Sequence, residues 1–218
     1  MKKLTGLSVL LALATMSSSA VLAGDNNYRV TITNATSHHV ITPPLIVVHN
    51  SNFKLFEVTE AASEGLATLA ETGDNSVLYG EVNGASGVYD VISSGNVIVY
   101  GNKASFDFSA PKNAKISFAA MLATSNDAFT AVSGKPLPKR SVAYMASTYD
   151  AGSELNNENC AYIPGPPCSA ESGNARATVG AEGFITIHGG IKGGSDLNPS
   201  QLDWRGATSI VTIERIRD

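Results

Sequence analysis

Short segments rich in β-branched and aromatic residues recur along the chain, and glycine, proline and asparagine separate them. This pattern predicts an all-β fold, an antiparallel β-sandwich, rather than a fold that alternates strands with helices. In the segment SIVTIERI near the C-terminus, the apolar centre predicts a strand that is largely buried on both faces. The expected strands are residues 28–33, 45–49, 97–100, 105–109, 115–122, 141–145, 184–188 and 209–216.

In one region, SEGLATLAE, the apolar residues recur at the spacing of a helix and not of a strand. Leu66 and Leu69 share one face of a helix there, Ser63 is suited to cap its N-terminus, and Gly73 follows its end. A second short helix is expected after Asp74. We therefore expect one or two short helices covering one end or edge of the sandwich.

The first 23 residues have the pattern of a secretory signal peptide. Lys2 and Lys3 precede an apolar run from Leu4 to Met16, and small residues follow up to Ala23. This run is too short to span a bilayer. We expect cleavage after Ala23, a secreted or periplasmic protein, and one domain over residues 24–218. No later apolar stretch approaches the ~18 residues of a membrane span, so stable membrane insertion is not expected.

The charge balance narrows the range of partners. The whole chain has a formal charge of −4, and loss of the two N-terminal lysines makes the mature chain more acidic, at −6. An acidic domain without a basic stripe is a poor match for nucleic acid. It is also a poor match for electrostatic docking on anionic membranes.

The two cysteines, Cys160 and Cys168, lie in the segment CAYIPGPPC. In an oxidising compartment the favoured interpretation is a disulfide that closes this short loop. The chain-entropy model gives such a loop roughly 2.5 kcal/mol, and the prolines already stiffen the unfolded loop and reduce that gain. A metal site is the weaker interpretation, because no histidine lies nearby in sequence.

Motifs typical of enzymes are missing from the sequence, which contains no G-x-S-x-G, no H-E-x-x-H and no glycine-rich phosphate loop. His38 and His39 are adjacent, so in a strand they would point to opposite faces and could not share a metal. His49 and His188 each end an apolar segment and are interpreted as structural, hydrogen-bonded histidines. We expect a protein without enzymatic activity. The alternatives are a periplasmic hydrolase or a carrier of a small ligand.

Three acidic residues gather in the segment TYDAGSELNNENC. Asp150, Glu154 and Glu158 are four residues apart, but Gly152 and the asparagines favour a loop over a helix. One interpretation is an acidic surface loop that solvent covers. The other is a cation site, which needs a further ligand from elsewhere in the chain.

Asp127 supplies that further ligand. It follows the apolar segment ISFAAML, and the next expected strand returns toward the same end of the sheet. Asp127 and Asp150 should therefore meet at one edge of the sandwich. Carboxylates brought together repel one another unless a cation neutralises them. Oxygen ligands on irregular backbone favour Ca²⁺ or a similar divalent cation.

Four stretches of the sequence form a recognisable set. They are HNSNFKLF followed by ASEGL and LAETGD (residues 49–74), SNDAF (125–129), YDAGSE (149–154) and VTIERI (211–216). In this order they resemble the motifs of the spondin N-terminal domain, the module of F-spondin and mindin and of single-domain secreted bacterial proteins. The resemblance covers roughly residues 31–217.

The resemblance implies an antiparallel β-sandwich that binds a calcium-like ion through three acids. In this chain they are Asp127, Asp150 and Glu154. Glu154 replaces an aspartate of the family pattern, Asn126 and Ala128 replace its proline and tryptophan, and the cysteine-bearing part of the intervening loop is missing. The pattern assigns no role to Glu158, which is expected beside the site or in solvent.

The resemblance also shapes the expected role. Members of the family in animals act in the extracellular matrix and in cell adhesion, and their partners do not transfer to this chain. We therefore expect a secreted module for adhesion or cell-envelope interactions. Its partner would be an extracellular or envelope protein or a glycan that the sequence does not identify.

Overall fold

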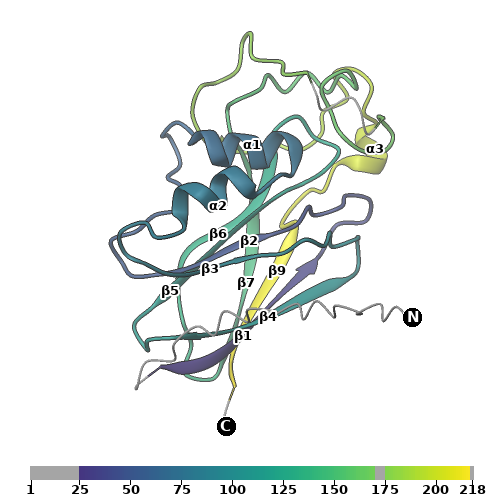
Figure 1. Ribbon diagram of the computed structural model, residues 1–218. Helices are drawn as coiled ribbons and strands as arrows, with labels where there is room; N and C mark the ends of the chain where they lie inside the picture. Colours follow the sequence, from purple (N-terminus) through teal and green to yellow (C-terminus); the bar gives the residue numbers. More distant parts are fainter. Residues whose placement is uncertain (1–24, 170–174, 217–218) are drawn as a thin grey trace, which may run out of the picture.

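A computed structural model describes residues 25–169 and 175–216 as a mainly antiparallel β structure with short helices (Figure 1). The signal peptide expected over residues 1–23 lies outside the described residues. The strands are β1 (Asn26–Asn34), β2 (Leu45–His49), β3 (Val88–Ser93), β4 (Lys103–Ala110), β5 (Lys115–Met121), β6 (Ala128–Pro136), β7 (Ser141–Asp150), β8 (Thr186–Ile187) and β9 (Ser209–Ile216). The helices are α1 (Glu64–Thr72), α2 (Ser76–Val82) and α3 (Pro199–Leu202).

All nine strands belong to one curved sheet with the order β3-β2-β5-β6-β7-β9-β1-β4, and β8 pairs with β7. Strand β7 joins the two halves of the sheet. Its first part pairs with β9, and its last part pairs with β6 on one side and β8 on the other. The sheet thus wraps around a core like a nearly closed barrel or sandwich, which confirms the predicted fold class.

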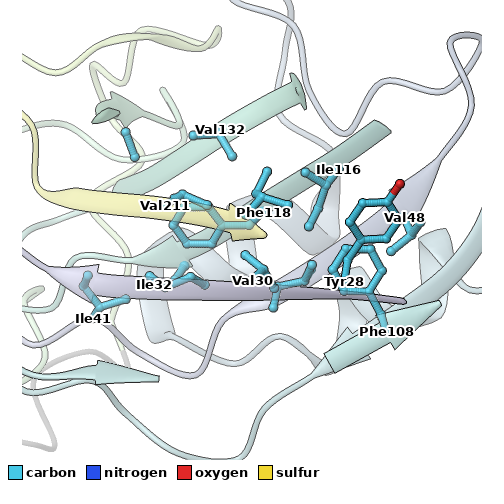
Figure 2. Close-up of a cluster of buried hydrophobic side chains, with 14 of the residues drawn as sticks. Tyr28, Val30, Ile32, Ile41, Val48, Phe108, Ile116, Phe118, Val132 and Val211 are labelled. Carbon is cyan, nitrogen blue, oxygen red and sulfur yellow. The ribbon is translucent and has the colours of Figure 1, made fainter. Parts of the chain in front are cut away.

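The main core fills the inside of this curved sheet. Alternate residues of β1, such as Val30 and Ile32, point into this core with Val211 of the neighbouring strand β9, and Phe118 of β5 packs in the same cluster (Figure 2). Strand alternation explains this arrangement, because every second side chain points to the same face of a sheet. The polar alternates, including the paired Arg29 and Asp107, face outward.

A second core lies between the outer face of the sheet and the helices α1 and α2, which Figure 1 shows on one side of β2 and β6. Every residue of β2 is buried for this reason. Ile46 and Val48 face the main core, while Leu45 and Val47 face the helices.

The helix boundaries follow the predicted signals. The Ser63 hydroxyl accepts a hydrogen bond from the Leu66 amide at 3.2 Å and caps α1. Gly73 ends α1 in the left-handed conformation with φ of 78°. Helix α2 follows Asp74 as expected, and the carboxylate of its Glu81 accepts a bond from the Gly65 amide at 2.6 Å.

Three expectations about strands were wrong in detail. Residues 97–100 form no strand: Ile98 makes one isolated bridge, to Ile41, while Val97, Val99 and Tyr100 are exposed. Strands β3 and β6 were not expected. Strand β9 is buried on one face only, because Val211 faces the main core and Ile210 faces outward.

The long segment between β7 and β9 is held by the predicted disulfide between Cys160 and Cys168, which the structure contains. A small apolar cluster packs beside it, with Ile163, Ile191, Leu197 and Leu202. Within residues 25–169 and 175–216, none of the helices is long and apolar enough to cross a membrane.

Candidate cation site

The hairpin formed by β6 and β7 brings the two aspartates together. Asp127 immediately precedes β6, Asp150 is the last residue of β7, and Ala128 pairs with Asp150 in the sheet. The carbonyl of Asp127 accepts a hydrogen bond from the Ala151 amide at 3.1 Å, which extends the ladder by one residue. The predicted meeting of the two aspartates at one edge is therefore correct, and the hairpin is its cause.

Asp127 is fully buried, and its two carboxylate oxygens have different surroundings. Its Oδ2 accepts bonds from the amides of Ser153 (2.8 Å) and Glu154 (3.0 Å) and from the Ser153 hydroxyl (3.2 Å). Its Oδ1 has no hydrogen-bond partner among the described residues. A buried oxygen without a partner is costly, so this atom could accept a further hydrogen bond or contact a cation.

Asp150 anchors the turn that starts the acidic loop. Its Oδ1 accepts a bond from the Gly152 amide at 2.7 Å, and its Oδ2 accepts one from the Asn156 side chain. Gly152 has a φ of 67°, and a β-carbon there would lie 2.3 Å from the carbonyl oxygen of Phe184. Glycine is required at this point because both the backbone conformation and the close approach exclude a side chain.

Glu154 is also buried, and its backbone and side chain have separate roles. The backbone amide binds Asp127, while the side-chain Oε1 accepts a bond from the Ala177 amide at 2.8 Å. Its Oε2 has no hydrogen-bond partner within the part of the chain that the structure describes. The hydrogen bonds of Glu154 thus leave this oxygen, like Asp127 Oδ1, available to a cation.

Burial and mutual repulsion make these carboxylates difficult to ionise. Burial, with a further contribution from the charge of Asp150, raises the pKa of Asp127 to about 7. Burial likewise raises the pKa of Glu154 to about 7, and the nearby charge of Glu71 adds to the effect. Burial also raises the pKa of Asp150. A divalent cation would reverse this balance by stabilising the charged forms.

The structure brings Asp127 and Asp150 together, but it does not bring the three predicted acids into one coordination set. Among the described residues, no three His, Cys, Asp or Glu side chains come together in an arrangement that could hold a metal ion. The charge of Asp150 acts on Asp127. The groups that act on the Glu154 side chain are different ones: Ala177, Glu71, Arg176 and the side chain of Asn126. Amide or carbonyl oxygens and water would therefore have to complete the shell of a calcium ion.

Glu158, the third acid of the loop, has a structural role that the sequence did not reveal. Its carboxylate is buried and accepts bonds from the amides of Lys192, Gly193 (2.6 Å) and Gly194 (2.7 Å). Successive amides around an anion form a binding concavity called a nest. The Gly193–Gly194 pair was the available sequence signal, since a nest requires glycine-like backbone conformations.

A hydrogen-bonded chain links Asp150 to His188. The Gly190 amide donates to His188 Nδ1 at 3.0 Å, so Nε2 carries the proton and faces Asn156 Oδ1 at 3.1 Å. The Asn156 amide then donates to Asp150. Burial lowers the pKa of His188 to about 4, so this imidazole is neutral, as expected for a structural histidine.

A cavity of about 240 Å³ lies against this chain and gives one side of Asp150 access to solvent. Asn156, Glu182, His188 and Lys192 also line it. Its acidic lining offers a route by which a cation could approach. His49, the other histidine interpreted as structural, bonds Ser117 and the Asn50 carbonyl instead.

Two further charged residues adjoin the site and were missed in the sequence. Glu71, in the last turn of α1, is buried and forms an ion pair with Arg176. Both charges act on Glu154, although Glu71 and Arg176 are 105 residues apart in sequence. No local pattern marks such a contact.

Taken together, the fold and site define a disulfide-containing β-sandwich module with buried acids at one sheet edge. The family model Spondin_N matches residues 35–154, which is more than half of the chain. The chain therefore belongs to the Spondin_N family, an extracellular family. No curated protein matches the chain. The matched range includes Asp127, Asp150 and Glu154, and it ends before the segment that carries the disulfide.

Proposed function

We propose that Asp127, Asp150 and Glu154 hold Ca²⁺ or a similar divalent cation that stabilises one edge of a secreted, non-enzymatic module. The observation that carries this proposal is the pair of buried carboxylate oxygens, Asp127 Oδ1 and Glu154 Oε2, that lack hydrogen-bond partners among the described residues. Native proteins rarely leave such atoms unsatisfied, and a cation bound against either oxygen would satisfy that oxygen.

The chemistry of the donor set supports a hard cation. Its charged ligands are carboxylate oxygens, and backbone carbonyls of the surrounding loop and water would supply the remaining oxygens. Calcium accepts six to eight oxygens in uneven geometry, as such a loop requires. The bound ion would neutralise the charges of Asp127 and Asp150 and fix the start of the acidic loop against β6.

The role we propose is adhesion or another interaction at the cell envelope. The chain belongs to an extracellular family, and its disulfide fits an oxidising compartment. A cation in this position would hold the acidic loop in one conformation and would not take part in a reaction with a substrate. The partner would be an extracellular or envelope protein or a glycan.

Thermal unfolding with excess calcium and with chelator tests this proposal. Free calcium at 100 times its dissociation constant adds about 2.7 kcal/mol to the free energy of unfolding. For a domain of this size, that raises the Tm by about 5–11 °C. Asp150→Asn should lose most of this increase while remaining folded in chelator.

Glu158→Gln provides the matched control, because Glu158 is a buried acid of the same loop whose oxygens are all used by backbone amides. This variant should lose stability in both conditions and keep the calcium increase. Equal Tm values of the wild type with calcium and with chelator, with no metal in elemental analysis, would contradict the cation site. Turnover of ester or glycoside substrates that depends on one serine would contradict the non-enzymatic role.

A further inference from the structure

Two parts of the chain that are distant in sequence adjoin Glu154: residues Arg176 and Ala177, and Glu71 in the last turn of α1. The Ala177 amide donates to Glu154 Oε1 at 2.8 Å, and the Leu155 amide donates to the Ala177 carbonyl at 2.7 Å. Arg176, next to Ala177, pairs with Glu71 at the end of α1. These contacts place one negative charge, on Glu71, and one positive charge, on Arg176, beside the proposed ligand Glu154.

The two charges differ in their surroundings. The side chain of Glu71 is 6% exposed, whereas that of Arg176 is 54% exposed. Water and salt screen an exposed charge far more than a buried one. Glu71 should therefore act on Glu154 more strongly than Arg176 does. The pKa of Glu154 agrees, because Glu71 raises it more than Arg176 lowers it.

We propose that Glu71 and Arg176 set the cation affinity of the site as an opposed pair, in which Glu71 attracts the ion and Arg176 acts as a tethered competing cation. This inference rests on the proposed function. Neither residue needs to be a ligand, since a charge acts on a divalent ion across several ångströms. Arg176 limits affinity in the intact protein because it offsets the charge of Glu71 and repels the incoming ion.

Calcium affinity measured by titration calorimetry on four proteins tests the pair: the wild type, Arg176→Gln, Glu71→Gln and the double variant. Arg176→Gln should bind calcium about three- to tenfold more tightly, and Glu71→Gln should bind it more weakly by a larger factor, because the buried charge is screened less. The double variant should lie between Glu71→Gln and the wild type, because the loss of the repulsive charge offsets part of the loss of the attractive one. Raising the salt concentration should shrink the effect of Arg176→Gln.

Two further variants separate charge from structure. Arg176→Lys keeps the charge and should bind calcium like the wild type. Arg205→Gln removes another exposed, ion-paired arginine, which pairs with Asp203 instead, and should leave the affinity unchanged. If the wild type binds calcium and Arg176→Gln and Glu71→Gln shift its affinity in the same direction or not at all, this inference is wrong while the site stands. If the wild type binds no calcium, the proposed function fails and this inference fails with it.

Discussion

Asp127→Asn offers the sharpest test of the buried acids, because it removes one charge and almost no volume. The amide oxygen can accept the three bonds that Ser153 and Glu154 now donate to Asp127 Oδ2. The amide nitrogen then occupies the position of the unpartnered Oδ1, where the negative charge of Asp150 acts favourably on it.

The magnitude follows from the pKa of Asp127. Folding raises this pKa from 3.8 to about 7, so the metal-free fold favours the protonated carboxyl. The associated stability is fully present below the unfolded pKa near 4 and is lost as the pH rises through about 7. A shift of about three units corresponds to about 4 kcal/mol. The variant recovers less than this, about 1–3 kcal/mol, because a charged acceptor strengthens the bonds from Ser153 and Glu154.

Thermal unfolding at two pH values provides the assay. At pH 8 in chelator, Asp127→Asn should melt about 3–10 °C above the wild type. At pH 5 the difference should be smaller, because Asp127 is then protonated in the folded protein and only the unfolded chain ionises it. Titration of Glu154 alters the wild type and the variant alike, as does that of His188, whose pKa is lowered to about 4.

Calcium should reverse the order of stability at pH 8. The wild type gains about 2.7 kcal/mol at 100 times the dissociation constant and more at higher calcium, whereas the variant gains little. The reasoning would be refuted by a variant that is less stable than the wild type in chelator at pH 8. It would also be refuted by an equal rise in Tm with calcium for both proteins.

Three other predictions concern the surroundings of the site. Gly152→Ala should lower the free energy of unfolding by about 2–3 kcal/mol in chemical denaturation, because it adds a clash with the Phe184 backbone to a positive φ; Gly183→Ala, also at positive φ but in open space, should cost only about 1–2 kcal/mol. Replacing both Cys160 and Cys168 with serine should cost up to about 2.5 kcal/mol, measured the same way, and an unchanged stability would show that the bond does not constrain the unfolded chain. Calcium should change the fluorescence of Trp204, the single tryptophan, because its ring lies 4.9 Å from His188 at the end of the hydrogen-bonded chain from Asp150; Asn156→Ala should remove most of that change, and a full response in this variant would exclude the chain as the route.

The sequence predicted the parts of the fold that depend on local patterns. The Ser63 cap, the Gly73 terminus and the apolar spacing between them define α1 without reference to the rest of the chain. Residues 97–100 show the limit of this reasoning, since β-branched residues favour strands only where a neighbouring strand receives them. Strand β6 shows the converse. Its sequence AFTAVSGKP mixes three strand formers with alanine, serine, glycine and proline, yet its first five residues are buried because β5 and β7 pair on either side.

The same distinction between local patterns and long-range contacts decides which parts of the candidate site could be predicted. The meeting of Asp127 and Asp150 was predicted, but its cause was not, because Asp127 precedes the unexpected strand β6, whose pairing with β7 brings the two aspartates together. Glu71, Arg176 and His188 could not be placed at the site, because their contacts join parts of the chain that are far apart in sequence. The bonds to Glu158 come from backbone amides, which every residue except proline possesses, so the Gly193–Gly194 pair marks a possible nest without showing which acid it binds.

The energetics of the site explain why a metal ion would suit it better than a lysine or arginine side chain of the protein itself. A fixed lysine or arginine at Asp127 would fill the buried space permanently, and breaking such a pair later would leave an uncompensated charge. The structure instead keeps Arg176 largely outside, on Glu71, and lets Lys192 line the cavity beside Asp150. Both cations lower the pKa of a neighbouring acid, yet burial still dominates and keeps the pKa values raised. If the proposed cation binds, the acids of the site would be protonated without metal and ionised with it. Because a cation binds only the charged state, the calcium-dependent rise in Tm should be small at pH 5 and large at pH 8. A rise that is equal at both pH values would show that the ion binds elsewhere.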